Sequence, residues 1–158
     1  MKYLFGIFYF FLFFSAHAQE IKHLDFIIVI DEQIVRESLG IKFVIKDETD
    51  YQEIETTEGY RPGNISLKQI DYDKLTSNQT KTLYIKFNYQ TYVGNESYYY
   101  NYEIEYNKIW LQDGYNILRV YNLDKRKYKK KFDPISVGKN YTFEVESPSH
   151  TFLRIRKK

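Results

Sequence analysis

The sequence contains no cysteine, and its 158 residues include three prolines, seven glycines and three histidines. The absence of cysteine excludes a thiol nucleophile, a cysteine-ligated zinc ion and disulfide bonds. The chain is long enough for one domain with a sizeable core. We therefore expect packing, or contacts with partners, to stabilise the fold without covalent cross-links.

Sequence patterns for catalysis are missing as well. A His-Glu-x-x-His zinc spacing, a Gly-x-Ser-x-Gly elbow and a phosphate-binding glycine loop do not occur. Asp71 and Asp73 lack the spacing of a calcium loop and are predicted to be solvated, so we expect no metal and no cofactor. Triads and carboxylate pairs can be scattered along a sequence. A hydrolase that uses scattered carboxylates or His150 is therefore an alternative function.

The N-terminus has the features of a secretory signal peptide. Lys2 precedes an apolar run of twelve residues, Tyr3 to Phe14, and small residues follow at Ala16 and Ala18. The run is shorter than the roughly 20 residues that span a membrane, which argues against an uncleaved anchor. We predict a cleaved segment 1–18, a single domain 19–158, and export to a periplasmic or extracellular location.

Residues that favour β-strands are abundant, with 17 tyrosines and 12 phenylalanines. Residues 83–93 alternate apolar and polar side chains, and residues 98–106 do so again after a Gly-Asn turn, which predicts a long hairpin. The same reasoning predicts strands at residues 24–30, 40–47, 51–57, 64–68, 115–123, 127–132, 141–147 and 151–156. Short strands without crossover helices indicate an all-β, antiparallel β-sandwich, immunoglobulin-like or transthyretin-like, with a small β-barrel as the alternative.

One segment resembles a known type of strand. GKNYTFEVES, Gly138 to Ser147, is similar to the penultimate strand of immunoglobulin-like and transthyretin-like sandwiches, where Gly-x-x-Tyr opens a strand of alternating apolar residues. The resemblance implies a tyrosine corner at Tyr141, whose hydroxyl would bond to nearby backbone. A likeness of fold implies no function.

The alternation places three tyrosines on the outward face of the long hairpin: Tyr84, Tyr92 and Tyr99. Exposed aromatic rings on a sheet can stack on sugars or bind a partner protein, which makes these residues a candidate aromatic binding patch. Cross-strand pairing that merely stabilises the sheet is the simpler interpretation, and we favour it.

A basic run, residues 125–131, contains six lysines or arginines in seven positions. We predict a turn followed by an edge strand in which Tyr128 and Phe132 point inward and the lysines deter pairing with another chain. In the alternative, part of the run joins two C-terminal arginines in a cationic patch of Lys125, Arg126, Lys127, Lys129, Lys131, Arg154 and Arg156. That patch would bind an anionic polymer or lipid surface. Nucleic acid is not the expected partner, because an exported protein meets little of it.

These observations predict an exported, non-catalytic binding or scaffolding module that acts on a protein or glycan of the cell envelope. Besides the hydrolase, the second alternative is a structural accessory subunit of a larger envelope assembly.

Overall fold

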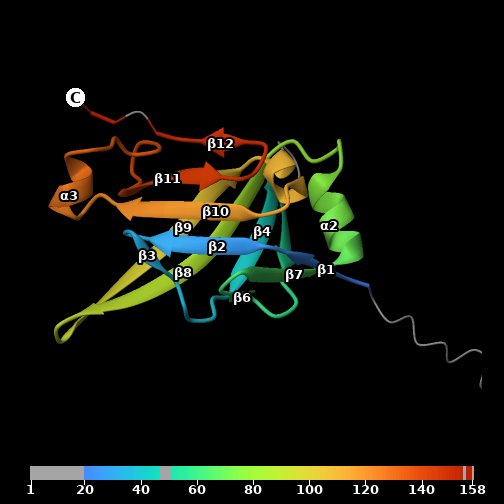
Figure 1. Ribbon diagram of the computed structural model, residues 1–158, viewed down its shortest axis with the longest axis horizontal. Coiled ribbons are helices and arrows are strands. Elements are labelled where there is room, and N and C mark those ends of the chain that lie inside the picture. Colours follow the sequence, from blue (N-terminus) through green and yellow to red (C-terminus); the bar gives the residue numbers. More distant parts are fainter. Residues whose placement is uncertain (1–19, 47–50, 155, 158) are drawn as a thin grey trace, which may run out of the picture.

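The computed structural model describes residues 20–46, 51–154, 156 and 157. The predicted signal peptide, residues 1–18, lies outside the described residues. The described chain is mostly β-structure, arranged in three sheets (Figure 1). No helix in the described ranges is both long and apolar enough to cross a membrane.

The four-stranded sheet has the order β5-β4-β8-β9 and contains the predicted long hairpin; we call it the hairpin sheet. Its strands are β4 (Ile41–Lys46), β5 (Tyr51–Glu55), β8 (Leu83–Val93) and β9 (Glu96–Tyr106). β8 and β9 pair over their whole length, and the two-residue turn Gly94-Asn95 joins them. β4 pairs with β8 between Ile41 and Ile45 and leaves the outer part of β8 without this neighbour.

The five-stranded sheet has the order β12-β11-β10-β2-β3; we call it the C-terminal sheet. Its strands are β2 (Phe26–Ile30), β3 (Gln33–Ile34), β10 (Asn116–Asn122), β11 (Tyr141–Glu146) and β12 (Thr151–Phe152). β2 and β10 pair in parallel, whereas β10 and β11 are antiparallel. The sheets are thus antiparallel in the main, with one departure from the predicted pattern among the described strands.

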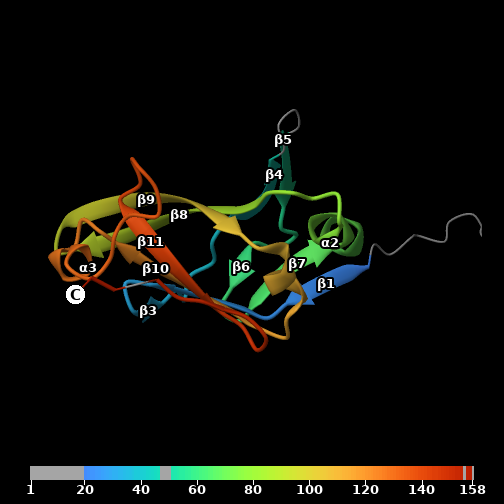
Figure 2. The same ribbon diagram turned by 90° about the horizontal axis from the view of Figure 1, so that it is seen from above.

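A three-stranded sheet and two of the three short helical elements lie at one end of the molecule (Figure 2). The sheet has the order β1-β7-β6, with β1 (Ile21–Leu24), β6 (Tyr60–Arg61) and β7 (Asn64–Lys68). The helical elements are α2 (Gln69–Thr76), the 3-10 helix η1 (Lys108–Gln112) and, at the opposite end, α3 (Arg126–Lys129). Leu75 of α2 and Leu111 of η1 are fully buried, which fixes both elements on the core.

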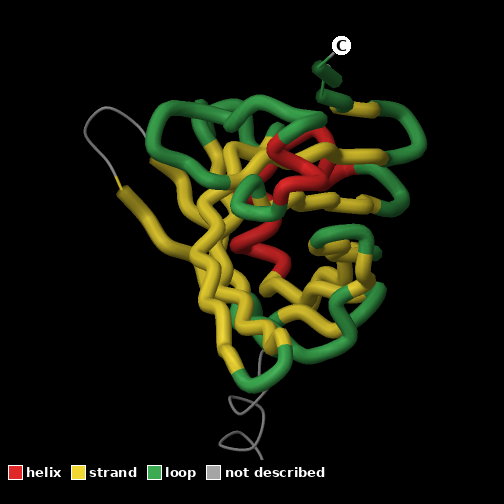
Figure 3. Tube along the Cα trace, turned by 90° about the vertical axis from the view of Figure 1, so that its left-hand side faces the viewer, coloured by secondary structure: helices red, strands yellow, loops and turns green. Residues whose placement is uncertain are grey.

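The hairpin sheet and the C-terminal sheet face each other, as Figure 3 shows in a view from the left of Figure 1. Aromatic side chains pack in the core between them. The ring centroids of Phe26 in β2 and Tyr106 in β9 are 6.0 Å apart, and Tyr141 of β11 packs edge-on against Tyr102 with ring centroids 5.1 Å apart. The architecture is the predicted all-β sandwich, and the sheets of the described chain do not close into the barrel considered as the alternative.

Tyrosine hydroxyls bridge the two sheets. Because side chains alternate along a strand, β9 turns Tyr100, Tyr102 and Tyr106 toward the core. Their hydroxyls donate to the side-chain oxygens of three residues on or just after β10, at 2.9 Å for Asp124, 2.8 Å for Asn122 and 2.7 Å for Asn116. A buried hydroxyl without a partner is costly, so each pair fixes the position of one sheet on the other.

Three predicted strands differ in the structure. The last one, predicted over residues 151–156, is a strand only at Thr151–Phe152, and Leu153, Arg154 and Arg156 are not in a strand. Residues 24–30 are split at Asp25 into β1 and β2, which belong to different sheets. Residues 127–132, predicted as an edge strand, instead form α3 and the turn that follows it. Tyr128 and Phe132 are both buried as expected, but a spacing of four residues satisfies a helix as well as a strand. The edge-strand interpretation of the basic run is therefore wrong.

The tyrosine bridges lead to a test of stability. Tyr102→Phe leaves the Asn122 side-chain oxygen without its buried donor, and we expect the free energy of unfolding to fall by about 1–3 kcal/mol. Urea denaturation followed by the fluorescence of Trp110, the single tryptophan, measures this change. Tyr99→Phe removes an exposed hydroxyl and should alter stability by less than about 0.5 kcal/mol. Equal effects of the two substitutions would contradict a special role for the buried bridge.

Candidate functional site

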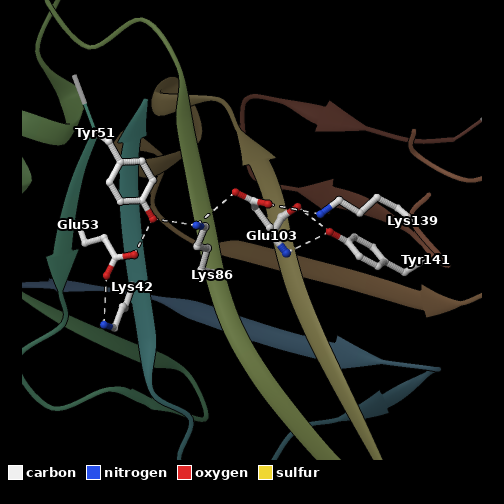
Figure 4. A network of polar contacts seen from close by, with 7 residues as sticks. All are labelled: Lys42, Tyr51, Glu53, Lys86, Glu103, Lys139 and Tyr141. Carbon is white, nitrogen blue, oxygen red and sulfur yellow. Dashed lines mark hydrogen bonds and ion pairs between the residues drawn. The ribbon is translucent and has the colours of Figure 1, made fainter. Parts of the chain in front are cut away.

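The outward face of the hairpin sheet carries a row of alternating charges (Figure 4). Lys86 of β8 stands opposite Glu103 of β9, and their side chains are 3.3 Å apart. Lys86 also donates to the Tyr51 hydroxyl at 2.9 Å, and Lys139 lies 3.3 Å from the Glu103 carboxylate. Partial burial tends to raise the pKa of Glu103, but the two ammonium groups more than offset it and hold this pKa below its ordinary value. Every acid in this row has a cation beside it, which indicates a structural role.

The same region closes part of the free edge of β9. Tyr141 crosses from the C-terminal sheet, and its hydroxyl donates to the backbone oxygen of Glu103 at 2.6 Å and accepts from the Glu103 backbone N–H at 3.0 Å. The backbone groups that an incoming strand would need at this position are thereby occupied. Tyr141 binds backbone as its resemblance implied, but in the facing sheet and 38 residues away along the chain.

The corresponding edge of β8 is open. Val93 and Glu96 flank the two-residue turn and form a hydrogen-bonded pair. The odd-numbered residues of β8 therefore direct their backbone N–H and C=O groups at β9, and the even-numbered residues direct these groups to the opposite edge. The 3.1 Å bond from the Lys46 N–H to the Thr82 oxygen agrees with this assignment. β4 covers this edge as far as Phe87. At Gln90 and Tyr92, no described residue hydrogen-bonds to the outward backbone groups.

β4 leaves this edge because the chain before it is bound elsewhere. Leu39 exchanges two backbone hydrogen bonds with Tyr60 of the small sheet, at 2.7 and 3.2 Å. Residues 37–39 thus stand away from β8, and a cleft of about 770 Å³ separates them from residues 88–92. A cleft of this size is in the range of ligand-binding sites, about 300–1,000 Å³.

Two of the three predicted patch tyrosines line this cleft. Tyr92 and Tyr99 are 68% and 70% exposed, and the Gln90 side-chain amide donates to both hydroxyls, at 2.7 and 2.8 Å. Tyr84 lies eight positions from Tyr92 along β8, about 26 Å at the rise of a strand, and is half-buried. The structure therefore brings Tyr92 and Tyr99 together and places Tyr84 apart from them.

The predicted cationic residues lie around α3, at the far end of the C-terminal sheet. Arg154 is committed to the fold, since its side chain bonds to Thr142 at 3.0 Å and to the Pro134 oxygen at 3.3 Å. Lys125 pairs with Asp31 at 2.6 Å, and Lys127 pairs with Glu32. No described residue forms an ion pair with the other four predicted members, Arg126, Lys129, Lys131 and Arg156.

His150 stands beside a serine and an aspartate, but their bonding order differs from that of a catalytic triad. Both the Ser147 hydroxyl and His150 Nδ1 bind the same oxygen of Asp113, the latter at 3.1 Å. The Ser147 hydroxyl oxygen also lies 2.7 Å from the His150 backbone oxygen and accepts from the His150 backbone N–H at 3.2 Å. A triad needs the imidazole between serine and carboxylate. Here the three groups close the turn before β12.

A second cleft, of about 550 Å³, opens beside Trp110, which lies edge-on to Tyr106 at 4.9 Å. Asp71 and Asp73 lie in α2, and the described residues contain no cluster of three potential metal ligands.

Sequence periodicity gave no indication that Trp110 would line a cleft. It also missed Glu37, Ser38 and Leu39 as a wall of the first cleft, because their position depends on a long-range bond to Tyr60.

Glu103 contributes to stability in two ways, through the bonds of its backbone to Tyr141 and through the ion pairs of its carboxylate. Tyr141→Phe removes the group that binds the Glu103 backbone and should cost about 1–3 kcal/mol of unfolding free energy at every pH. Glu103→Gln removes an ion pair at the surface and should cost about 0.2–1 kcal/mol. Because the folded pKa of Glu103 is lowered, its contribution is complete above about pH 4.3 and is lost as the pH falls through the folded pKa. Urea denaturation between pH 3 and pH 7 measures both; a pH-independent loss in Glu103→Gln would contradict this assignment.

No protein-family model, no curated protein and no solved structure matches the chain. Three features of the structure bear on function: the open edge of β8, the exposed tyrosine pair and the charges around α3.

Proposed function

We propose that the protein is a non-catalytic binding module that takes an extended polypeptide segment of a partner along the open edge of β8. The observation that carries the proposal is the pair of uncovered backbone positions, Gln90 and Tyr92, beside a cleft lined by Tyr92 and Tyr99. A segment that adds to a sheet edge gains main-chain hydrogen bonds, while side-chain pockets supply specificity.

A polypeptide suits this edge better than a glycan does. Along a strand, outward N–H and C=O groups recur at every second residue, about 6.6 Å apart, and another strand has the same repeat. The tyrosine rings and the Gln90 amide lie beside that row and can contact the side chains of the incoming segment. Tyrosine is enriched in protein interfaces because it combines apolar area with a hydroxyl.

The hairpin is held in place before a partner arrives. Tyr100 and Tyr102, on the inward face of β9, bind Asp124 and Asn122 of the opposite layer. The outer half of the hairpin extends beyond β4 (Figure 1), and the bond from Tyr100 to Asp124 joins it to the opposite layer at the level of Tyr89. Ordering a flexible segment lowers affinity, so a fixed edge favours binding.

Export and a partner in the cell envelope are part of the same proposal and derive from the sequence of the N-terminus. A transient ligand would make the protein a binding module, and a permanent one would make it an accessory subunit of an assembly. The edge of β8 serves either arrangement.

The test uses a displayed library of ten-residue peptides and a matched pair of variants. Gln90→Pro removes the outward N–H and adds a ring on the edge, whereas Gln90→Ala removes the side-chain amide and keeps the N–H. We expect peptides selected on the wild-type protein to bind the alanine variant with an affinity lowered less than about tenfold. Their binding to the proline variant should fall by at least about a hundredfold, as measured by calorimetry.

The peptide offers an independent readout that does not depend on how a variant folds. Methylation of alternate peptide nitrogens should abolish binding in one register and spare it in the other, because one set of N–H groups faces β8. Binding that survives both methylation patterns and Gln90→Pro would contradict strand addition. Selection of no peptide, together with retention of neutral oligosaccharides, would favour the glycan hypothesis instead.

A further inference from the structure

The basic run 125–131 does not form the lysine-protected edge strand that its sequence predicted. Lysines on an edge strand would deter pairing with other chains, but α3 exposes no strand edge. Tyr128 and Phe132 anchor this segment, with ring centroids 5.2 and 4.8 Å from that of Tyr121. The helical turn therefore holds its cations in fixed positions on the surface.

The C-terminal tail lies against the same segment. The Lys157 backbone N–H donates to the Lys131 oxygen at 2.9 Å, and the Lys157 ammonium lies 2.8 Å from Asp133. The Arg156 guanidinium lies over the Phe132 ring, 5.5 Å from its centroid. Figures 1 and 2 both show the C-terminal tail beside α3. Two segments far apart in the sequence thus contribute cations to one surface.

Part of this charge is neutralised by the turn between β2 and β3. Asp31 and Glu32 have positive φ angles, 53° and 68°, as expected of a two-residue hairpin turn of type I′. Asp31 accepts from the backbone and side-chain amides of Asn122, both at 2.8 Å, and also pairs with Lys125. Glu32 pairs with Lys127, whose hydrogen bond holds the pKa of Glu32 below its ordinary value.

The remaining cations form what we call the α3 cationic surface. They are all exposed, and within the described ranges none has an ion-pair partner: Arg126, Lys129, Lys130, Lys131 and Arg156. Like charges held close together repel, and an anionic ligand relieves that repulsion. This set differs from the predicted patch, because Lys130 joins it while Lys125, Lys127 and Arg154 are engaged elsewhere.

We propose that the α3 cationic surface binds a linear polyanion, such as a sulfated or carboxylated polysaccharide chain. Arginine guanidinium groups can form two parallel hydrogen bonds with a sulfate or carboxylate, and Arg126 and Arg156 supply them beside the three lysines. Exposed carboxylates border the surface at Glu32, Asp124 and Asp133. A flat anionic membrane would meet these acids as well, whereas a narrow chain can follow the cations between them. The α3 cationic surface shares no residue with the edge of β8, and this proposal does not depend on the function proposed there.

Heparin is the polyanion probe, and binding is measured by calorimetry from about 50 to 300 mM NaCl. We expect binding that weakens steeply with salt. The triple variant Lys129→Ala, Lys130→Ala, Lys131→Ala should lower affinity at least about tenfold and reduce the slope of log K against log salt by about two to three. The control variant Lys46→Ala, Lys68→Ala, Lys81→Ala removes the same charge from exposed positions elsewhere and should change affinity less than about twofold.

Three outcomes would overturn the proposal. The first is no binding of heparin at 50 mM NaCl. The second is an equal loss of affinity in the two triple variants, which would show that net charge alone explains the effect. The third is binding of phosphatidylglycerol vesicles to the wild-type protein more tightly than heparin, with the same loss in the α3 variant, which would identify a membrane as the partner. Circular dichroism of both variants establishes that each is folded.

Discussion

The structure depends on buried tyrosine hydroxyls that join two sheets without a covalent link. Tyr100, Tyr102 and Tyr106 project from one strand and meet oxygen acceptors that follow one another along β10 and the turn after it. Each aromatic ring buries apolar area, while each hydroxyl must find its acceptor in the low-dielectric interior. Burial raises the pKa of Tyr102, so the hydroxyl stays a donor over the physiological range. A chain without cysteine thus sets the position of one sheet on the other with directional bonds.

The same bridges explain how a long hairpin can extend past its neighbour and remain ordered. On the edge of β9, Tyr141 satisfies both backbone groups of Glu103, whereas on the edge of β8 the groups of Gln90 and Tyr92 face the cleft. Natural proteins commonly protect such edges, so the uncovered edge beside exposed tyrosines is the basis for the docking position that we propose. The α3 cationic surface shares no residue with this edge, and together the two proposed sites would let one small protein connect a polypeptide to an acidic polymer.

Local periodicity predicted much of the fold and part of the candidate site. The alternation in residues 83–106 predicted both hairpin strands and the outward direction of Tyr92 and Tyr99. It misassigned residues 127–132, because apolar positions four apart fit two periods and the lysines between them fit both as well. The acceptors Asn116 and Asn122 gave no signal, since a buried amide looks like a turn residue until its partner is known. The open edge of β8 was equally inaccessible, because it depends on Leu39 pairing with Tyr60 rather than continuing along β8.

Amide hydrogen exchange along β8, resolved residue by residue by NMR, distinguishes a rigid hairpin with an open edge from a frayed or a covered one. If the outer hairpin is rigid and its edge uncovered, the amides of Tyr89 and Thr91, which face β9, will be protected, while those of Gln90 and Tyr92 will exchange rapidly. Uniformly rapid exchange would show a frayed hairpin, and uniform protection would show an edge that is already covered. Either result would contradict the account of a fixed, open edge.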